Sequence, residues 1–295
     1  MSGESVCRTF TVGKHHHLTL VADTWGDPAA EPILFAHGGG QTRHAWGQTA
    51  RLLAEQGFYT LALDLRGHGD SSWDPGEDYS FQDYAADLQS VADQLGRKPM
   101  AVGASLGGIS SLIAHHVSRH QLFSKIVLVD ITPRVELSGL GRIRDFMLEH
   151  AETGFASPQE AAEYVAAYTP NRRRGANAEG LKKNLRLGAD GRYRWHWDPK
   201  FFAARPDQKR AGHARFELME EAARALTIPA LLVRGRISDL VSPEGAREFL
   251  ELVPHARFVD VEEAGHMVAG DKNDIFSGAV IEFLCTASRK SRTGA

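Results

Sequence analysis

The chain has 295 residues, a length that predicts one large domain, alone or with an insertion. Hydrophobic residues make up 42% and charged residues 24% of the sequence, which is typical of a globular protein and excludes wholesale disorder. The net charge of −3 argues against nucleic-acid binding, which needs a basic surface.

The cysteines and the chain start point to a reducing compartment. Cys7 and Cys285 are the only two cysteines, which excludes a disulfide framework and a cysteine-based metal site. The first ten residues lack the pattern of a signal peptide, and no apolar run approaches the roughly 18 residues of a membrane span. We therefore expect a soluble cytoplasmic protein that has no membrane or nucleic-acid partner.

Short apolar runs alternate with helical patterns along most of the chain. The first two runs predict an antiparallel hairpin at a sheet edge: residues 7–12 and 18–23. The later runs predict buried parallel strands: residues 33–36, 59–63, 100–102, 126–129, 230–233 and 257–261. Apolar stripes at threes and fours predict helices between and after them, which include residues 81–95 capped by Ser80, 246–253 opened by Ser242 and Pro243, and 275–283.

The alternation stops between the strands at 126–129 and 230–233. The intervening stretch is helical and irregular, which indicates a cap inserted over the carboxyl edge of the sheet. We expect an α/β core made of residues 1–133 and 227–295, and a helical cap made of residues 134–226.

A Gly-x-Ser-x-Gly motif, residues 103–107, follows one predicted strand and precedes a helical run. A serine in a tight turn between a strand and a helix is lifted clear of the sheet. The glycines on either side leave room for the turn, and the free N–H groups of the helix favour negative charge beside the hydroxyl. Ser105 is therefore the candidate nucleophile.

A serine hydroxyl needs a base that takes its proton, and the base needs a carboxylate partner. His266 follows the last predicted strand, at the edge where parallel strands end together, and is the candidate base. We predict that Asp239 is its partner, because the order Ser105, Asp239, His266 is the expected one. Asp130, which also follows a predicted strand, is the competing candidate.

Acyl transfer also needs two donors at the position where the oxyanion forms. The N–H of Leu106, directly after the nucleophile, is one candidate. The N–H of Gly39, in the glycine run after the strand at 33–36, is the other. No metal or cofactor is required by this chemistry, and none is predicted.

These motifs together resemble the α/β-hydrolase superfamily over residues 10–284: the His-Gly-Gly at 37–39, the segment 64–71, the motif at 103–108, Ser238-Asp239 and Gly265-His266. The resemblance implies a mostly parallel central sheet with helices on both faces and a cap. Within the superfamily the chain is similar to the capped branch with a serine nucleophile, which includes esterases, C–C hydrolases and haloperoxidases. For this chain it implies a Ser105, Asp239 and His266 triad with Gly39 and Leu106 as the oxyanion hole.

The predicted activity is hydrolysis of a small or medium carboxylic ester through an acyl-enzyme. Two alternatives stay open: C–C bond hydrolysis of a meta-cleavage-type diketo acid with the same triad, and a non-catalytic binding protein of the same fold. An excess of basic residues between 171 and 200 would suit an anionic substrate but is also typical of a solvated surface. The expected partner is a small-molecule substrate, and a homo-oligomer stays open. The candidate pocket residues are aromatic or large: Trp46, Trp195, Trp197, Phe201, Phe202 and Met267.

Overall fold

The computed structural model describes residues 4–13, 16–168, 177–202, 208–262, 264–266 and 276–286. Its strands are β1 Val6–Val12, β2 Leu18–Trp25, β3 Pro32–Ala36, β4 Tyr59–Leu63, β5 Met100–Ala104, β6 Ile126–Val129, β7 Leu185–Leu187, β8 Tyr193–Trp195, β9 Ala230–Gly235 and β10 Arg257–Val261. Its α-helices are α1 Gly47–Glu55, α2 Phe81–Gln94, α3 Leu106–Val117, α4 Leu137–Glu149, α5 Pro158–Tyr168, α6 Ala178–Leu181, α7 Gln208–Arg224, α8 Pro243–Leu252 and α9 Ser277–Thr286.

Within the described residues, eight strands form one sheet in the order β1-β2-β4-β3-β5-β6-β9-β10. The strands from β4 to β10 in this order are parallel, whereas β2 pairs antiparallel with both β1 and β4. The predicted edge hairpin and the six predicted parallel strands are therefore confirmed. The α/β-hydrolase fold class that the motifs implied is confirmed with them.

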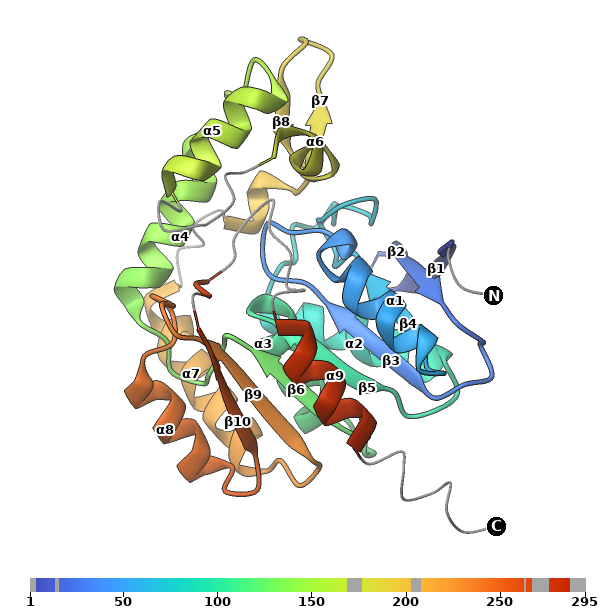
Figure 1. Cartoon of the computed structure of the whole chain (residues 1–295). Coiled ribbons are helices and arrows are strands. Elements are labelled where there is room, and N and C mark those ends of the chain that lie inside the picture. The colour runs from blue at the N-terminus through green and yellow to red at the C-terminus, as the bar shows by residue number, and fades with distance from the viewer. Residues whose placement is uncertain are drawn as a thin grey trace.

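Helices cover both faces of this sheet (Figure 1). Successive residues of the fully buried strand β3 point to opposite faces, so Leu34 and Ala36 join one core cluster and Ile33 and Phe35 the other. Helices α2, α3 and α8 contribute to the first cluster, and α1 and α9 contribute to the second. Burial on both faces explains why the parallel strands are continuous apolar runs in the sequence.

The helix starts follow from their caps. The Ser80 side chain accepts a hydrogen bond from the N–H of Asp83, and the Asp83 carboxylate accepts one from the N–H of Ser80, which makes a capping box for α2. Ser242 caps α8 with Pro243 in its first turn, as predicted. Each cap satisfies N–H groups that the first turn of a helix leaves without a partner.

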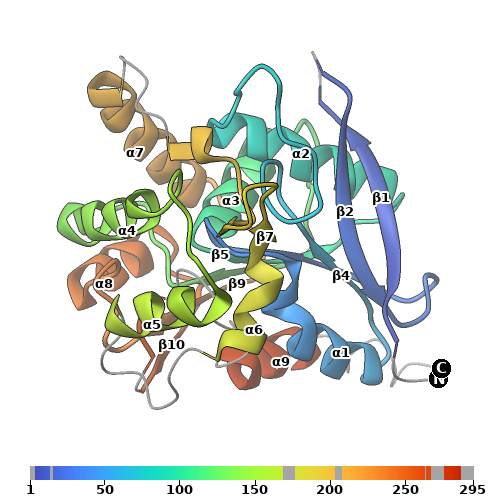
Figure 2. The same ribbon diagram turned by 90° about the horizontal axis from the view of Figure 1, so that it is seen from above.

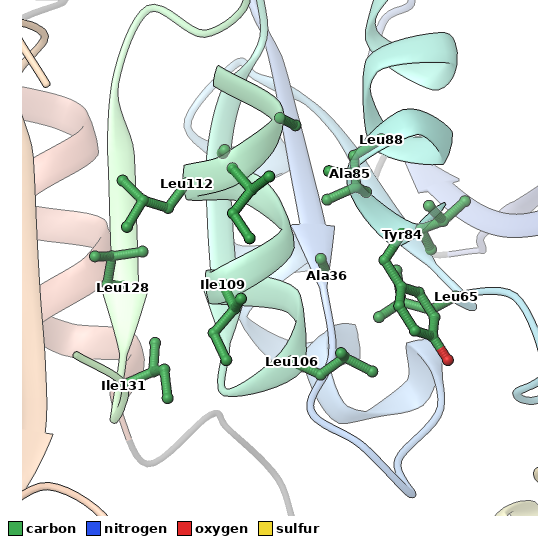
Figure 3. Close-up of a cluster of buried hydrophobic side chains, with 14 of the residues drawn as sticks. Ala36, Leu65, Tyr84, Ala85, Leu88, Leu106, Ile109, Leu112, Leu128 and Ile131 are labelled. Carbon is green, nitrogen blue, oxygen red and sulfur yellow. The ribbon is translucent and has the colours of Figure 1, made fainter. Parts of the chain in front are cut away.

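Helix α3 lies along the sheet, and its residues Leu106, Ile109 and Leu112 are buried (Figure 3). Leu106, at the first turn, packs near Ala36 of β3 and Tyr84 of α2 (Figure 3). This packing fixes the first turn of α3 at the edge where β3 and β5 end.

The elements between β6 and β9 begin with α4, α5, α6 and the β7–β8 hairpin, which lie beyond one end of the sheet (Figures 1 and 2). Helix α7, which follows them, packs instead beside α3 and α8 of the core. The division of the chain into a core and a cap, at residues 133/134 and 226/227, stays a prediction. Among the described helices, none combines the length and the apolar character that a membrane crossing requires.

The residues that follow the β7–β8 hairpin, in the predicted cap, are bonded to the predicted core. The N–H of Gly69 donates to the carbonyl of His196 at 2.8 Å, and the N–H of Asp198 donates to the carbonyl of Gly67 at 2.8 Å. The buried Asp198 carboxylate accepts a hydrogen bond from the Tyr79 hydroxyl at 2.6 Å. These bonds fix residues 196–198 over the loop that follows β4.

Candidate active site

Ser105 lies in the turn between β5 and α3, with φ +46° and ψ −112°. A positive φ is costly for a residue with a side chain and persists only where the surroundings enforce it. Here the surroundings are tight: a Cβ on Gly103 would lie 2.5 Å from the Gly107 backbone, and one on Gly107 would lie 2.3 Å from the Ala36 carbonyl oxygen. The glycines of the motif are therefore required by close backbone approach, as the sequence predicted.

The ends of neighbouring strands bring the other candidate residues to this turn. The N–H of Ser105 donates to the carbonyl of Val129, the last residue of β6, at 3.1 Å. The next residue, Asp130, donates its N–H to the carbonyl of Val233 in β9 at 2.7 Å. Ser105 and Asp130 therefore follow two strands that lie side by side, and both have a positive φ.

His266 pairs with Asp130. Its Nδ1 atom lies 2.7 Å from Asp130 Oδ2, and the two side chains are only 6% and 4% exposed. With the Nδ1 proton donated to the carboxylate, the Nε2 lone pair is left for another partner. The Asp130 carboxylate is further held by the N–H of Gly235 at 3.0 Å on Oδ1 and by the Ser238 hydroxyl at 2.6 Å on Oδ2.

The prediction that Asp239 partners His266 is wrong in this structure. Asp239 Oδ2 instead accepts hydrogen bonds from Arg142 of α4, the shorter at 2.8 Å, and both side chains are well exposed. The loop after β9 turns Ser238 toward Asp130 and points Asp239 away from it. The competing candidate, Asp130, therefore occupies the position beside the imidazole.

Residues 38–41, which follow β3, donate hydrogen bonds through three of their four N–H groups. The N–H of Gly38 donates to Gln41 Oε1 at 2.9 Å, and the N–H of Gln41 donates to the carbonyl of Gly38 at 3.1 Å. The N–H of Gly40 donates to His68 Nε2 at 3.1 Å. Within the described part of the chain, the N–H of Gly39 and that of Leu106 donate to no other group.

Residues 38–41, which we call the oxyanion segment because they include the candidate donor Gly39, lie next to the serine. A Cβ on Gly38 would be 3.5 Å from the Cβ of Ser105, and the N–H of Gly107 donates to the carbonyl of His37 at 3.1 Å. The segment and the first turn of α3 are thus bonded to each other beside Ser105. Both candidate oxyanion donors lie in these two stretches.

Two buried histidines form hydrogen bonds with the same segment. His37 accepts a hydrogen bond from the N–H of Leu65 on Nε2 and donates from Nδ1 to the carbonyl of Gly38, and His68 donates from Nδ1 to the carbonyl of Arg66. Burial lowers the pKa of His37 to about 4. Burial, together with the neighbouring His37, lowers the pKa of His68 to about 3. Both rings are therefore neutral at pH 7 and can act as acceptors.

The predicted cap contacts this segment through Phe201. A Cβ on Gly39 would lie 3.2 Å from the Phe201 ring, so the ring rests against the Gly39 backbone. The same ring packs edge-on against His68, with centroids 5.1 Å apart, and against Tyr84 of α2, with centroids 6.0 Å apart. Phe201 is only partly buried and is a pocket candidate that contacts the residue carrying a candidate oxyanion donor.

The tryptophan candidates lie in packed positions. Trp46 is fully buried against Phe35 beneath the sheet, Trp195 is buried against Phe155 within the cap, and Trp197 packs with Phe202. A role for them in substrate binding stays a prediction. Met267 lies outside the described residues.

Three residues of this site carried weaker signals in the sequence. Asp130 follows its strand directly, in the same way as Ser105, and that position was a usable signal. His68 lies in the Arg-Gly-His-Gly run after β4, and Ser238 directly precedes Asp239. Within the described residues, Ser105 Oγ makes no hydrogen bond to His266, and no group of three or more His, Cys, Asp or Glu side chains could hold a metal ion.

Comparisons with known proteins agree with this fold. The family described as alpha/beta hydrolase fold matches residues 31–272. Esterase Rv0045c of Mycobacterium tuberculosis is 32% identical over 84% of this chain and 80% of its own length. The mouse sn-1-specific diacylglycerol lipase ABHD11 is 28% identical over 88% of this chain and 82% of its own length. The crystal structure of E-2-(acetamidomethylene)succinate hydrolase superposes with a TM-score of 0.79 at 26% identity, over 95% of this chain and 99% of that one.

Proposed function

The chain belongs to the α/β-hydrolase fold family, whose relatives here are named as hydrolases, and on that premise we propose that it is a serine hydrolase of small or medium carboxylic esters. Two observations support the proposal: the strained turn of Ser105, whose N–H donates to the residue before Asp130, and the buried Asp130–His266 pair. A hydroxyl, an imidazole and a carboxylate at adjoining strand ends are the parts of a nucleophilic triad.

In the proposed first step, Ser105 Oγ attacks the ester carbonyl carbon while His266 Nε2 takes the hydroxyl proton. Asp130 stabilises the imidazolium that forms through its bond to Nδ1. The negative oxygen of the tetrahedral intermediate accepts hydrogen bonds from the N–H groups of Gly39 and Leu106. Because these donors are already oriented by the bonded segments around them, they need no reorganisation as the charge develops.

The intermediate then collapses. The bond from the carbonyl carbon to the alcohol oxygen breaks, and the leaving alcohol takes the proton from His266. Water enters, gives a proton to His266 and attacks the acyl-serine. The second intermediate expels Ser105, which recovers the proton, and the carboxylic acid leaves.

Among the described residues 177–200, the basic side chains do not specifically favour an anionic substrate. Within the described residues 177–200, each lysine or arginine already has a partner in the protein: Lys182, Lys183, Arg186, Arg192, Arg194 and Lys200. Their charge therefore serves contacts within the protein. These described residues therefore give no reason to prefer the diketo acid of the C–C hydrolase alternative over a neutral ester.

The test is labelling of the purified chain with a fluorophosphonate, followed by peptide mapping and a panel of p-nitrophenyl esters from acetyl to dodecanoyl. Labelling at Ser105 and hydrolysis of the shorter esters are expected. Ser105→Ala should lose turnover by roughly four orders of magnitude, whereas Ser118→Ala, at the other end of α3, should match the wild type. A folded wild type that neither reacts with the probe nor hydrolyses any ester would overturn the proposal and favour the non-catalytic binder.

A further inference from the structure

The loop between β9 and α8 directs one side chain onto the Asp130 carboxylate. Ser238 Oγ lies 2.6 Å from Asp130 Oδ2, the same oxygen that faces His266 Nδ1. The charged side chains of this loop face elsewhere: Arg236 pairs with Asp260 and Glu262, and Asp239 pairs with Arg142.

The direction of the Ser238 hydroxyl proton follows from its other partners. A serine hydroxyl has one proton to donate and two lone pairs. The N–H groups of Leu240 and Val241 donate to Ser238 Oγ at 3.1 and 3.2 Å. With both lone pairs occupied, the proton is left to point at Asp130 Oδ2.

The loop itself is fixed in place. The N–H of Ile237 donates to the carbonyl of Ala264, two residues before His266, at 3.0 Å. Gly235 allows this approach, because a Cβ there would lie 2.5 Å from the Ala264 carbonyl oxygen. The buried Arg234 donates from Nε to the carbonyl of Val241 at 2.7 Å. Ser238 is therefore presented to Asp130 by a rigid frame that also holds the backbone leading to His266.

We propose that Ser238 is a positioning residue that fixes the Asp130 carboxylate for His266, through a hydroxyl that donates to Asp130 Oδ2. This inference rests on the proposed function. The Ser238 hydrogen bond holds Asp130 Oδ2 in its orientation toward the imidazole of His266. It also draws negative charge from that oxygen, which limits how strongly the carboxylate stabilises the protonated ring.

The experiment compares Ser238→Ala with Ser238→Thr, which retains a hydroxyl, in kcat/KM for one short ester across pH. Ser238→Ala should lose about tenfold to a hundredfold in kcat/KM, mainly in kcat, since a charge-assisted hydrogen bond is lost. Its acid limb should move to higher pH by about half a unit, because the less shared carboxylate stabilises the protonated imidazole more. Ser238→Thr should stay within about threefold of the wild type, on the same bond-strength reasoning.

Ser242→Ala is the matched control, because Ser242 also caps a backbone N–H in this segment but does not contact Asp130. It should lose some stability and keep the wild-type pH profile. If Ser238→Ala fails to fold, Ser238→Cys keeps nearly the same volume with a weaker donor and should show the same changes at smaller size.

Two results would overturn the inference. One is a Ser238→Ala enzyme whose kcat/KM lies within about twofold of the wild-type value and whose acid limb does not move. Such a small change would be less than the loss of a charge-assisted hydrogen bond should cause. The other is an equal loss in Ser242→Ala, which would assign the effect to the loop backbone. Fluorophosphonate labelling of wild-type Ser105 separates these from failure of the proposed function, because a labelled wild type retains the nucleophile whatever Ser238 does.

Discussion

His68 Nε2 accepts a hydrogen bond from the N–H of Gly40, the residue directly after the candidate oxyanion donor Gly39. The acceptor is available only while the ring is neutral. His68 therefore sets the orientation of the oxyanion segment without being in a position to react with substrate itself.

Replacing this acceptor should lower the rate rather than the affinity. His68→Ala leaves the N–H of Gly40 buried without a partner, so the oxyanion segment should shift and kcat should fall by about tenfold or more. His68→Gln places an amide oxygen near the position of Nε2 and should recover most of the rate. Steady-state kinetics on one ester would measure the difference in kcat between the two variants. Equal kcat values would count against a role of His68 in orienting the segment.

The two neutral histidines also predict how stability depends on pH. Because their folded pKa values, about 4 and about 3, lie below the ordinary 6.5, the unfolded chain binds protons first as the pH falls. Their contribution is complete above pH 6.5 and is lost as the pH falls toward 4 and 3. Between pH 6.5 and 5 each should cost about 2 kcal/mol of unfolding free energy.

Urea unfolding at pH 7, 6 and 5 measures this cost. His68→Gln cannot take up the proton and should lose about 2 kcal/mol less than the wild type over that range. Parallel curves for the two proteins would show that His68 is already charged, or already exposed, in the folded chain.

Replacement of Asp130 and replacement of Asp239 should have clearly different effects on kcat. Asp130→Asn removes the acceptor for His266 Nδ1 and should lower kcat by roughly 10³–10⁴-fold, since the imidazole loses its orienting carboxylate. Asp239→Asn breaks only an exposed ion pair with Arg142, and such pairs contribute little. Its kcat should stay within about twofold of the wild type. A reversal of this order would restore Asp239 as the partner.

These aspartates also show where sequence reasoning reaches its limit. Continuous apolar runs predicted the parallel strands, and the glycines at 103 and 107 predicted the strained turn, because each pattern follows from local burial or close contact. Asp130 follows β6 directly and Asp239 lies in the loop after β9, and the expected order of triad residues ranked Asp239 first. The choice depends on backbone direction: Asp130 has φ +50°, and the loop after β9 turns Ser238 inward instead of Asp239.

The same limit applies to the aromatic residues of the cap. Trp195, Trp197 and Phe201 look alike in the sequence, each a large apolar side chain in an irregular stretch. Long-range packing separates them. The tryptophans are buried among other aromatic rings, and Phe201 alone of the three rests against Gly39.

Phe201→Ala should therefore alter catalysis from within the cap. Loss of the ring leaves space beside Gly39, so kcat on short esters should fall several-fold while longer acyl groups become relatively better substrates. Phe201→Leu should recover part of the kcat. A chain-length profile measured beside Leu187→Ala, an exposed cap residue, supplies the control, and an unchanged profile in Phe201→Ala would contradict the prediction.

Gly107→Ala should prevent stable folding of the turn, because its Cβ would lie 2.3 Å from the Ala36 carbonyl oxygen. Gly141→Ala on α4 is the contrast, since a Cβ there meets nothing within 4 Å. That change should add about 0.5–1 kcal/mol to the unfolding free energy through helix propensity. Circular dichroism and urea unfolding of both variants check this, and a stable Gly107→Ala protein would disprove the close approach.

The cap leaves the sheet after β6 and the chain returns in β9, and these two strands pair directly with each other. An insertion that begins and ends on two hydrogen-bonded strands has its two ends close together. Its length and shape can therefore change while the register of the flanking strands is kept. The architecture is therefore modular: a different insertion can replace the residues between the end of β6 and the start of β9, provided that it renews the contact that Phe201 makes with Gly39.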